Sequence, residues 1–340
     1  MDEIVIVDAG CVSALGDSTE ACFENMGGDV NFETQYDFEV SMPPKLKRSS
    51  DRFSKMYVTV MDKMVQRNEE ELNKYPKERI GTIFSSEYGP VTTNLLFARE
   101  VLEKDPEICS PAKFSNTVAN ACVGIACLNY GYKGVSTMLQ GSNSFSFSAD
   151  LLNEGKADLI FSGYADEYNE EVARALRDVA ESPRQFSENS VVFLLGNKDF
   201  EGKSICRIKN ISCINFGSEP QKDKEKNSAR IIRCIERCLK DNKPVDAVIY
   251  TADDTEIGAF ESNIIKEYFK NNVALGKTRP FVGDVLGSNL NMNIFLGVTA
   301  LKKKQLNDKL FDGVNGSCKR ILVTGYDIVG NYSCILLEAE

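Results

Sequence analysis

The stretch that decides the fold is Ala157–Tyr164, ADLIFSGY, because the chain echoes it at Lys319–Tyr326 as KRILVTGY. In both copies an apolar run, typical of a buried strand, ends in a Gly-Tyr pair. A second apolar run follows each copy, at Val191–Leu195 in the first case and at Ser333–Leu337 in the second. Repetition in the same order favours a chain made of two similar βαβαβ halves over one long open sheet.

Strand-like and helix-like segments alternate along the rest of the chain, which is typical of an α/β layered fold. The sequence predicts strands at Ile4–Val7, Ile80–Ser85, Asn189–Leu195 and Val245–Ala252, and helices at Asn116–Asn129, Leu151–Gly155, Ser228–Lys240, Ile257–Lys270 and Ile294–Lys302. The polar run Gly217–Asn227 is expected to be a solvated surface loop. We therefore divide the chain into an N-terminal half, residues 1–200, and a C-terminal half, residues 201–340.

The composition limits the kinds of protein and partner that need to be considered. Of the 340 residues 42% are hydrophobic and 26% are charged, which is ordinary for a globular protein with a buried core. A net charge of −10 argues against a nucleic acid or an anionic membrane as partner, because both need a positive surface. The sequence contains no apolar run long enough to span a membrane, and its acidic start MDEIVIVDAG differs from a signal peptide. The expected location is the cytoplasm.

The cysteines and the missing histidines limit the chemistry. None of the eleven cysteines forms a Cys-x-x-Cys pair, and Cys234 and Cys238, one helical turn apart, would be a poor metal site by themselves. We expect reduced, buried, structural cysteines and neither a metal nor a cofactor. The chain has no histidine, so any mechanism that needs an imidazole base is excluded.

Four segments resemble, in the same order along the chain, the β-ketoacyl synthases of the thiolase superfamily. They are IVIVDAGCVSALG at Ile4–Gly16, CSPAKFSNTVANACVG at Cys109–Gly124, GKADLIFSGYADE at Gly155–Glu167 and VGNYSCILL at Val329–Leu337. The resemblance implies a thiolase-like fold, with two similar halves in αβαβα layers, and a dimer formed through a central strand near Val135–Leu139. The chain is shorter than is usual in the family, and the difference falls after the nucleophile region and between Asp166 and Val191.

The same resemblance locates the family's catalytic positions. Its nucleophile is a cysteine at the start of a buried helix; aligning Gly141 with the preceding glycine places Ser142 there, with Gln140 or Asn143 as alternatives in another register. Thr251 takes the place of the first histidine. Arg279 and Asp284 take the places of the lysine and the histidine of the family's Lys-Ser-x-x-Gly-His segment. The cysteine and both histidines of the condensation reaction are therefore replaced.

Each of these positions has a second interpretation. Ser142 could act as a nucleophile with Asp284 as its base, or Ser142, Asn143 and Ser144 could cap the following helix. Arg279 could bind an acidic carrier or a phosphopantetheine phosphate, or it could pair with Asp284. The pair Asp253-Asp254 could hold a cation or form a solvated turn.

These features lead to a principal hypothesis and two alternatives. The principal hypothesis is a non-catalytic subunit, similar to the chain-length factors of type II polyketide and aryl-polyene systems. Such a subunit pairs with a cysteine-bearing ketosynthase as a heterodimer and works with an acyl carrier protein. The first alternative is an acyltransferase, thioesterase or decarboxylase of the same fold that uses Ser142 or Gln140. The second is a homodimer that binds acyl groups or a carrier protein without catalysing a reaction.

Overall fold

A computed structural model describes residues 4–104, 109–180, 185–217, 223–251, 256–270, 272–285, 289–327 and 329–340. Ten strands form one sheet in the order β3-β2-β4-β5-β1-β6-β10-β9-β7-β8. Their bounds are β1 Ile4–Val12, β2 Ile80–Ser86, β3 Ser136–Gln140, β4 Leu159–Asp166, β5 Asn189–Gly196, β6 Cys206–Asn215, β7 Ala247–Tyr250, β8 Ala274–Lys277, β9 Arg320–Tyr326 and β10 Asn331–Ala339.

The sheet consists of two halves with the same strand order. Read from the outer edge inwards, the first half is β3-β2-β4-β5-β1 and the second is β8-β7-β9-β10-β6. In each half the three outer strands are parallel and the next two pairings are antiparallel. The halves join where β1 pairs with β6, from Ile4 opposite Ile208 to Ile6 opposite Cys206. The duplication predicted from the repeated strand motif is therefore confirmed.

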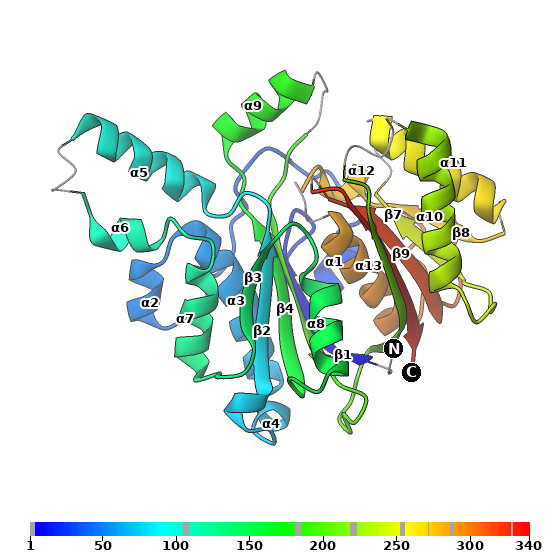
Figure 1. Cartoon of the computed structure of the whole chain (residues 1–340), viewed down its shortest axis with the longest axis horizontal. Helices are drawn as coiled ribbons and strands as arrows, with labels where there is room; N and C mark the ends of the chain where they lie inside the picture. The colour runs from blue at the N-terminus through cyan, green and yellow to red at the C-terminus, as the bar shows by residue number, and fades with distance from the viewer. Residues whose placement is uncertain are drawn as a thin grey trace.

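Helices cover the sheet in layers (Figure 1). The helices are α1 Thr19–Asn25, α2 Pro44–Ser49, α3 Arg52–Arg67, α4 Glu69–Leu72, α5 Val91–Glu103, α6 Pro111–Ser115, α7 Ala121–Tyr130, α8 Ser144–Asn153, α9 Glu170–Ala180, α10 Lys224–Cys238, α11 Glu256–Phe269, α12 Arg279–Val282 and α13 Asn289–Lys303, with a 3-10 turn at Lys77–Arg79. Helices α3 and α7 pack on the outer face of the first half, and α10 and α11 on that of the second. Helices α8 and α13 share the central apolar cluster, which gives the αβαβα layers.

The glycines of the repeated Gly-Tyr motif both lie under a helix, but on different faces of the sheet. A Cβ at Gly163 in β4 would lie 2.4 Å from Cε2 of Tyr57 in α3, in the outer layer. A Cβ at Gly325 in β9 would lie 2.9 Å from Cα of Leu290 in α13, in the central layer. Each position therefore leaves no room for a side chain, although the contact differs between the halves.

Three expectations about secondary structure need correction, and one strand was not predicted. The helix predicted for Leu151–Gly155 is the end of a longer helix, α8, which begins at Ser144 and ends at Asn153. The helix predicted for Asn116–Asn129 begins only at Ala121, because the preceding residues form turns in which the Thr117 N–H bonds to the Phe114 carbonyl. The end of the polar run Gly217–Asn227 belongs to α10, whose first turn is capped by the Asp223 carboxylate; residues 218–222 lie outside the description. Strand β6 was not predicted.

In the described part of the chain no helix combines the length and the apolar character that crossing a bilayer requires. The boundary predicted near residue 200 falls between β5 and β6, which end and begin at Gly196 and Cys206. The division into residues 1–200 and 201–340 stays a prediction.

Candidate functional site

The segment that matches the family's nucleophile region forms a sharp turn between β3 and α8, which we call the elbow, residues 140–144. Gln140 ends the strand and is exposed, Gly141 has a φ of +98°, and α8 begins at Ser144. Only glycine adopts such a φ readily. Ser142 is 1% exposed. The elbow therefore places a buried serine at the N-terminus of a helix, where the partial positive charge of the helix dipole is concentrated.

Asp327 fixes the elbow from the other half of the molecule. Its Oδ2 accepts hydrogen bonds from the Ser142 backbone N–H at 3.1 Å and from the Ser142 hydroxyl at 3.0 Å. The same carboxylate accepts bonds from the Asn331 backbone N–H at 2.8 Å and from Asn331 Nδ2 at 2.9 Å. Asp327 follows β9, so these bonds join the β9–β10 turn to the end of β3.

Close packing reinforces this contact. A Cβ at Gly141 would lie 2.9 Å from Cγ2 of Val329 and 3.0 Å from Oδ2 of Asp327, both in the β9–β10 turn. Helix α13 adds a contact, because Asn291 Nδ2 donates to the Ser142 carbonyl at 3.4 Å. The serine hydroxyl therefore points at a carboxylate that already has three other donors.

The predicted side-chain caps of α8 are not formed. Asn143 occupies the N-cap position, but its side chain makes no capping hydrogen bond, and its Oδ1 is buried without a partner among the described residues. The Ser142 hydroxyl donates to Asp327, and the Ser144 hydroxyl accepts from the Ser85 hydroxyl at 2.8 Å. The serine hydroxyls do not bind the backbone N–H groups of the helix, because the Asp327 carboxylate and the Ser85 hydroxyl, which lie outside α8, bind the serine hydroxyls instead.

Thr251 lies just after β7 in a buried polar network of the second half. Its hydroxyl accepts a bond from Asn293 Nδ2 at 3.3 Å, and the same amide group donates to the Thr324 carbonyl at 2.8 Å. Asn293 Oδ1 accepts from the Thr278 hydroxyl at 2.6 Å. The position that the sequence resemblance matched to the first histidine is thus a fully buried threonine that is hydrogen-bonded to α13.

Arg279 and Asp284, the other two matched positions, form an ion pair. Arg279 begins α12, and its N–H donates to the Thr251 carbonyl at 3.3 Å. Asp284 is 4% exposed, and its backbone pairs with the segment at Gln185 and Ser187. Of the two interpretations of Arg279, the structure shows the ion pair.

The structure contributes little on metals. The residues that it describes contain no cluster of three or more histidine, cysteine, aspartate or glutamate side chains able to hold an ion. The predicted acidic pair Asp253-Asp254 lies outside the described residues. Cys234 and Cys238 are both buried, as expected for structural cysteines.

Asp166 occupies, in the first half, the strand end that corresponds to Asp327. It ends β4 and accepts bonds from the Ser86 hydroxyl and from the N–H groups of Tyr88 and Gly89, so it holds the turn after β2. Burial raises the pKa of Asp166, although the Ser86 hydroxyl opposes the shift. Each half therefore closes its fourth strand with a buried carboxylate that binds a neighbouring turn.

The next residue, Glu167, is a buried carboxyl group that also binds a neighbouring element. Burial raises the pKa of Glu167 to about 7, even though the Thr92 N–H donates to it at 2.9 Å. The nearby carboxylates Asp51 and Glu188 act in the same direction. Because Thr92 is in the first turn of α5, Glu167 anchors that helix.

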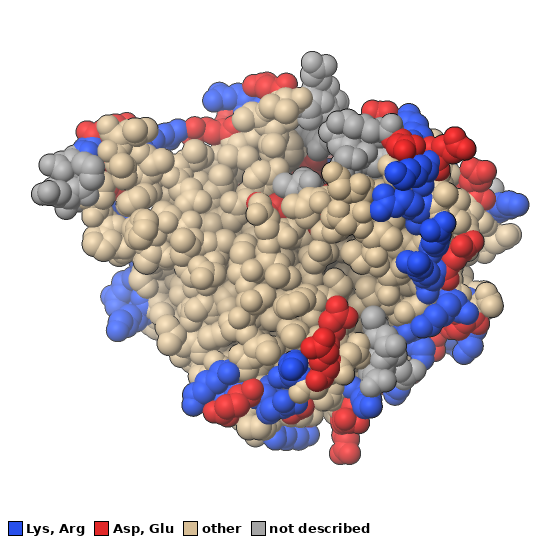
Figure 2. All heavy atoms as spheres, in the orientation of Figure 1, with Lys and Arg blue, Asp and Glu red and all other residues tan. Residues whose placement is uncertain are grey.

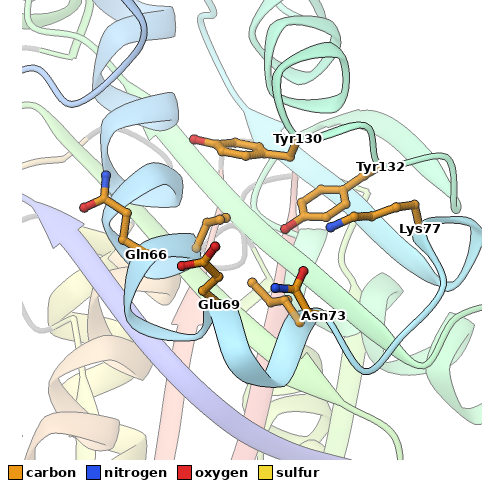
Figure 3. Close-up of a pocket in the computed structure, with 8 residues that line it drawn as sticks. Gln66, Glu69, Asn73, Lys77, Tyr130 and Tyr132 are labelled. Atoms are coloured by element: carbon orange, nitrogen blue, oxygen red, sulfur yellow. The ribbon is translucent and has the colours of Figure 1, made fainter.

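A pocket in the described structure lies away from these positions (Figure 3). It has a volume of about 210 Å³ and lies between α3, α4 and the end of α7, with Tyr130 and Tyr132 on one side and Glu69 and Asn73 opposite; Lys77 lies beside Tyr132, with its Nζ 4.9 Å from the ring centroid. Its volume is below the roughly 300–1,000 Å³ usual for ligand sites. We assign it no ligand.

Sequence reasoning missed Asp327, Asn291 and Asn293. The signal that could have found Asp327 was the repeat itself, since an aspartate follows the Gly-Tyr pair of both copies, at Asp166 and at Asp327. The asparagines give no such signal, because an asparagine in a helical segment is more often exposed than buried.

No family model matches the chain. Among curated proteins it resembles the 3-oxoacyl-[acyl-carrier-protein] synthase 2 of Staphylococcus aureus (strain COL), with 22% identity over 242 residues, 61% of this chain and 58% of that protein. It also resembles the enzyme of that name from Synechocystis sp., with 22% identity over 347 residues, 87% of this chain and 79% of that protein. The S. aureus match thus spans little more than half of the relative.

The solved structures decide the fold. The ketosynthase in complex with its chain length factor from Xenorhabdus doucetiae has a TM-score of 0.82 at 15% identity, with 100% of this chain and 98% of that chain covered. The chain has the ketosynthase fold. The thiolase-like architecture predicted from the sequence motifs is confirmed, and the elbow and the β9–β10 turn can be described as parts of a ketosynthase-like scaffold.

Proposed function

We propose that this chain is a non-catalytic ketosynthase-like subunit of the chain-length-factor type. It pairs with a cysteine-bearing β-ketoacyl synthase and serves fatty-acid or polyketide synthesis, with aryl-polyene synthesis as one such pathway. The fold supports the proposal, since it is similar to that of a chain from the ishigamide ketosynthase/chain length factor and of a chain from a ketosynthase in complex with its chain length factor. Fold alone does not determine function, so the argument depends on the site.

The observation that carries the proposal is the Ser142–Asp327 contact at the elbow. Condensation needs a thiolate at the helix mouth and donors aimed at the acyl oxygen. Here the side chain at that place donates to a buried carboxylate, and the β9–β10 turn packs against Gly141. No cysteine occurs between Cys127 and Cys206, so a shift of register does not supply the thiol. These contacts support a structural role for the elbow in this subunit.

The surface around β3 supports pairing. Between Phe114 and Ala149 the only charged residue of the sequence is Lys133. This range contains α7, β3 and α8, and Figure 2 shows that the face over these elements is nearly free of charged side chains. Leu128 on α7 and Phe147 on α8 are exposed there, at 87% and 37%. An extended uncharged face with exposed apolar side chains is typical of a protein interface.

Strand β3 itself offers backbone groups to a partner. Among the described residues it pairs only with β2, and its side chains are half-exposed or exposed. An uncharged edge strand is a template for pairing with a strand of another chain. We therefore place the heterodimer interface at the β3 edge, as the family resemblance implied, with a second copy of this chain as the alternative partner.

A carrier protein belongs to the same proposal. The curated relatives are by name synthases that act on acyl-carrier-protein substrates. We propose that an acyl carrier protein delivers the chain to the paired ketosynthase and not to Ser142 of this subunit. The proposed location, the cytoplasm, is that expected from the sequence.

The deciding experiment is co-expression with the cysteine-bearing ketosynthase encoded nearest to this gene, followed by affinity purification through a tag on this chain alone. We expect a 1:1 complex, and condensation activity that depends on the partner's cysteine. Ser142→Ala should leave that activity within twofold. A stable homodimer that ignores the ketosynthase would contradict the proposal.

A second candidate function has one observation in its favour. The hydroxyl of Ser142 donates to a carboxylate, and a carboxylate can accept the proton of an attacking serine. The chain would then be an acyltransferase or thioesterase with Asp327 as base. Incubation of the isolated chain with acyl thioesters separates the two functions: thiol release that is lost in both Ser142→Ala and Asp327→Asn would favour the enzyme.

A further inference from the structure

A contact between two thiols joins helix α1 to strand β1. The Sγ atoms of Cys11 in β1 and Cys22 in α1 lie 3.4 Å apart, and the two residues are 1% and 0% exposed. The Ser13 hydroxyl also lies near both sulfur atoms, at 3.9 and 3.7 Å. The sulfur atoms of a disulfide are about 2.05 Å apart, so each sulfur of this pair needs to move by less than about 1 Å to form one. We call Cys11 and Cys22 the thiol pair.

The turn between the two cysteines brings them face to face. Ser13 and Gly16 exchange backbone hydrogen bonds, both of 3.0 Å, and the Cys11 thiol donates to the Gly16 carbonyl at 3.5 Å. Ser18 then caps α1 through its side chain. The chain therefore folds back after β1 and returns Cys22, near the start of α1, to the side of Cys11.

Helix α1 also contacts the second half of the molecule. Its Glu20 forms an ion pair of 3.1 Å with Lys302 of α13, and the Phe23 carbonyl accepts a hydrogen bond from Asn307 Nδ2 at 2.7 Å. One short helix thus binds both β1 of the first half and α13 of the second. A covalent bond within the thiol pair would fix this helix to β1 and so strengthen the contact between the halves.

We propose that the thiol pair is a site of reversible oxidation, at which a peroxide converts Cys11 and Cys22 to a disulfide. The Cys22 sulfur attacks one peroxide oxygen, the O–O bond breaks, and the second oxygen takes the thiol proton and leaves as water, so that Cys22 becomes a sulfenic acid. The Cys11 sulfur then attacks Cys22, the S–O bond breaks, and the hydroxyl group leaves as a second water with the Cys11 proton. Two thiols are oxidised and one peroxide is reduced to two waters.

The positions of the two sulfurs decide the order of these steps. Helix α1 has seven residues, so a small local opening exposes Cys22, whereas Cys11 lies in β1 between β5 and β6. Burial, with a further contribution from Cys22, raises the pKa of the Cys11 thiol well above its usual value. A protonated thiol is a poor nucleophile towards peroxide, but contact with Cys22 favours Cys11 in the second step.

The pair Cys234 and Cys334 is a weaker candidate for the same chemistry. A hydrogen bond with the Cys334 thiol lowers the pKa of Cys234, which favours its reaction. However, Cys234 lies on the inner face of α10, a helix of 15 residues whose Ile231 and Ile235 pack in the apolar cluster of the second half. Exposure of Cys234 therefore needs a larger opening than exposure of Cys22.

The test treats the full chain with hydrogen peroxide, alkylates the remaining thiols with N-ethylmaleimide in denaturant, and cuts the chain after glutamate for mass spectrometry. This cleavage puts Cys11 in fragment 4–20 and Cys22 in fragment 21–24. We expect the two fragments to be linked in most molecules and to be released by dithiothreitol. The oxidised chain should melt at least about 3 °C above the reduced chain, because the link restricts the unfolded state.

Cys22→Ala should lose both the linked fragments and the rise in melting temperature. Cys234→Ala, which removes another fully buried cysteine, is the matched control and should keep both. Circular dichroism before oxidation checks that both variants are folded, and the fragment analysis of the unchanged chain needs no variant. Complete alkylation of Cys11 and Cys22 after peroxide, or a link between Cys234 and Cys334 in place of the expected one, would overturn the proposal. An unchanged melting temperature in the linked chain would refute the strengthened contact between the halves.

Discussion

The two edges of the sheet, β3 and β8, occupy equivalent places in the two halves but are covered differently. At β8, a Cβ on Gly276 would lie 2.7 Å from Cε1 of the buried Phe311, so the segment that contains Phe311 packs directly against the strand. Strand β8 also ends in Lys277, whose Nζ lies 3.5 Å from Asp312. Strand β3 carries no charge, its ends Ser136 and Gln140 are exposed, and its Met138 and Leu139 pack half-buried against the apolar clusters.

The helices that follow the second strand of each half also differ. The β2–β3 connection contains α5, which has no buried residue, before α7, which buries Cys122, Val123 and Ala126. Helix α11, after β7, buries Phe260, Ile264 and Ile265. The two edges thus differ in α5 and in the charge at the end of the edge strand, and we call the uncharged edge at β3 the open edge and the edge at β8 the protected edge. Because an open uncharged edge promotes pairing, we infer that the first half forms the interface and the second half supplies stability.

The largest expected effect comes from placing charges on the open edge. Ser136→Lys with Gln140→Lys changes two exposed side chains of β3 and leaves its bonds to β2. Burying two unpaired cations against a partner should weaken the complex with the ketosynthase at least about 1,000-fold, or about 4 kcal/mol, in analytical ultracentrifugation. Asn315→Lys with Ser317→Lys, two exposed positions after the Phe311 segment, is the control and should pair normally. Normal pairing of the β3 variant would move the interface elsewhere.

The next effect concerns Phe311, whose side chain packs against β8. Phe311→Ala removes a side chain that is 1% exposed and should lower the free energy of unfolding by about 3 to 4 kcal/mol in urea. Val314→Ala, at a residue that is 45% exposed, is the control, with an expected change within about 0.5 kcal/mol. Equal stabilities of the two variants would show that the segment does not protect β8.

The elbow at the end of the open edge depends on the other half. Asp327→Ala leaves the Ser142 and Asn331 N–H groups buried without their acceptor and should cost about 3 kcal/mol in the same urea experiment. Asp178→Ala, at an exposed residue of α9, controls for the loss of one charge. A loss of less than about 1 kcal/mol in the free energy of unfolding would mean that water replaces the carboxylate and that Asp327 does not stabilise the elbow.

The smallest effect depends on pH and concerns the anchor of α5. The pKa of Glu167 rises from 4.5 to about 7 on folding, so this group's contribution to stability is fully present below pH 4.5 and is lost as the pH rises through 7. Gln keeps an acceptor for the Thr92 N–H but does not ionise. Glu167→Gln should therefore match the parent near pH 4.5 and be more stable by roughly 2 to 3 kcal/mol at pH 8.

Urea unfolding from pH 4.5 to 8.5 measures this difference, with Glu170→Gln at an exposed neighbour as the control. An advantage of Glu167→Gln that did not change with pH would show that packing, and not ionisation, is responsible.

Much of the fold was predictable because it depends on local patterns that occur twice. The apolar strands before Gly163 and Gly325 are each marked by their own sequence, and the close approach of α3 and α13 requires glycine at both. Strand β6 was missed because its buried and exposed positions are set by packing on α10 and by pairing with β1 and β10, long-range contacts that leave only a weak local signal.

The sequence by itself indicated two similar halves, and it determined that the chain lacks histidine and that neither a cysteine nor a histidine stands at the four positions matched to the family's catalytic residues. Those facts follow from the composition of the chain and from the order of its residues, and they need no coordinates. Only the tertiary structure decided what Ser142 contacts. Asp327 is 185 residues away in the sequence. A hydrogen bond between them exists because the layered sheet brings the β9–β10 turn to the end of β3, and no local pattern records that distance.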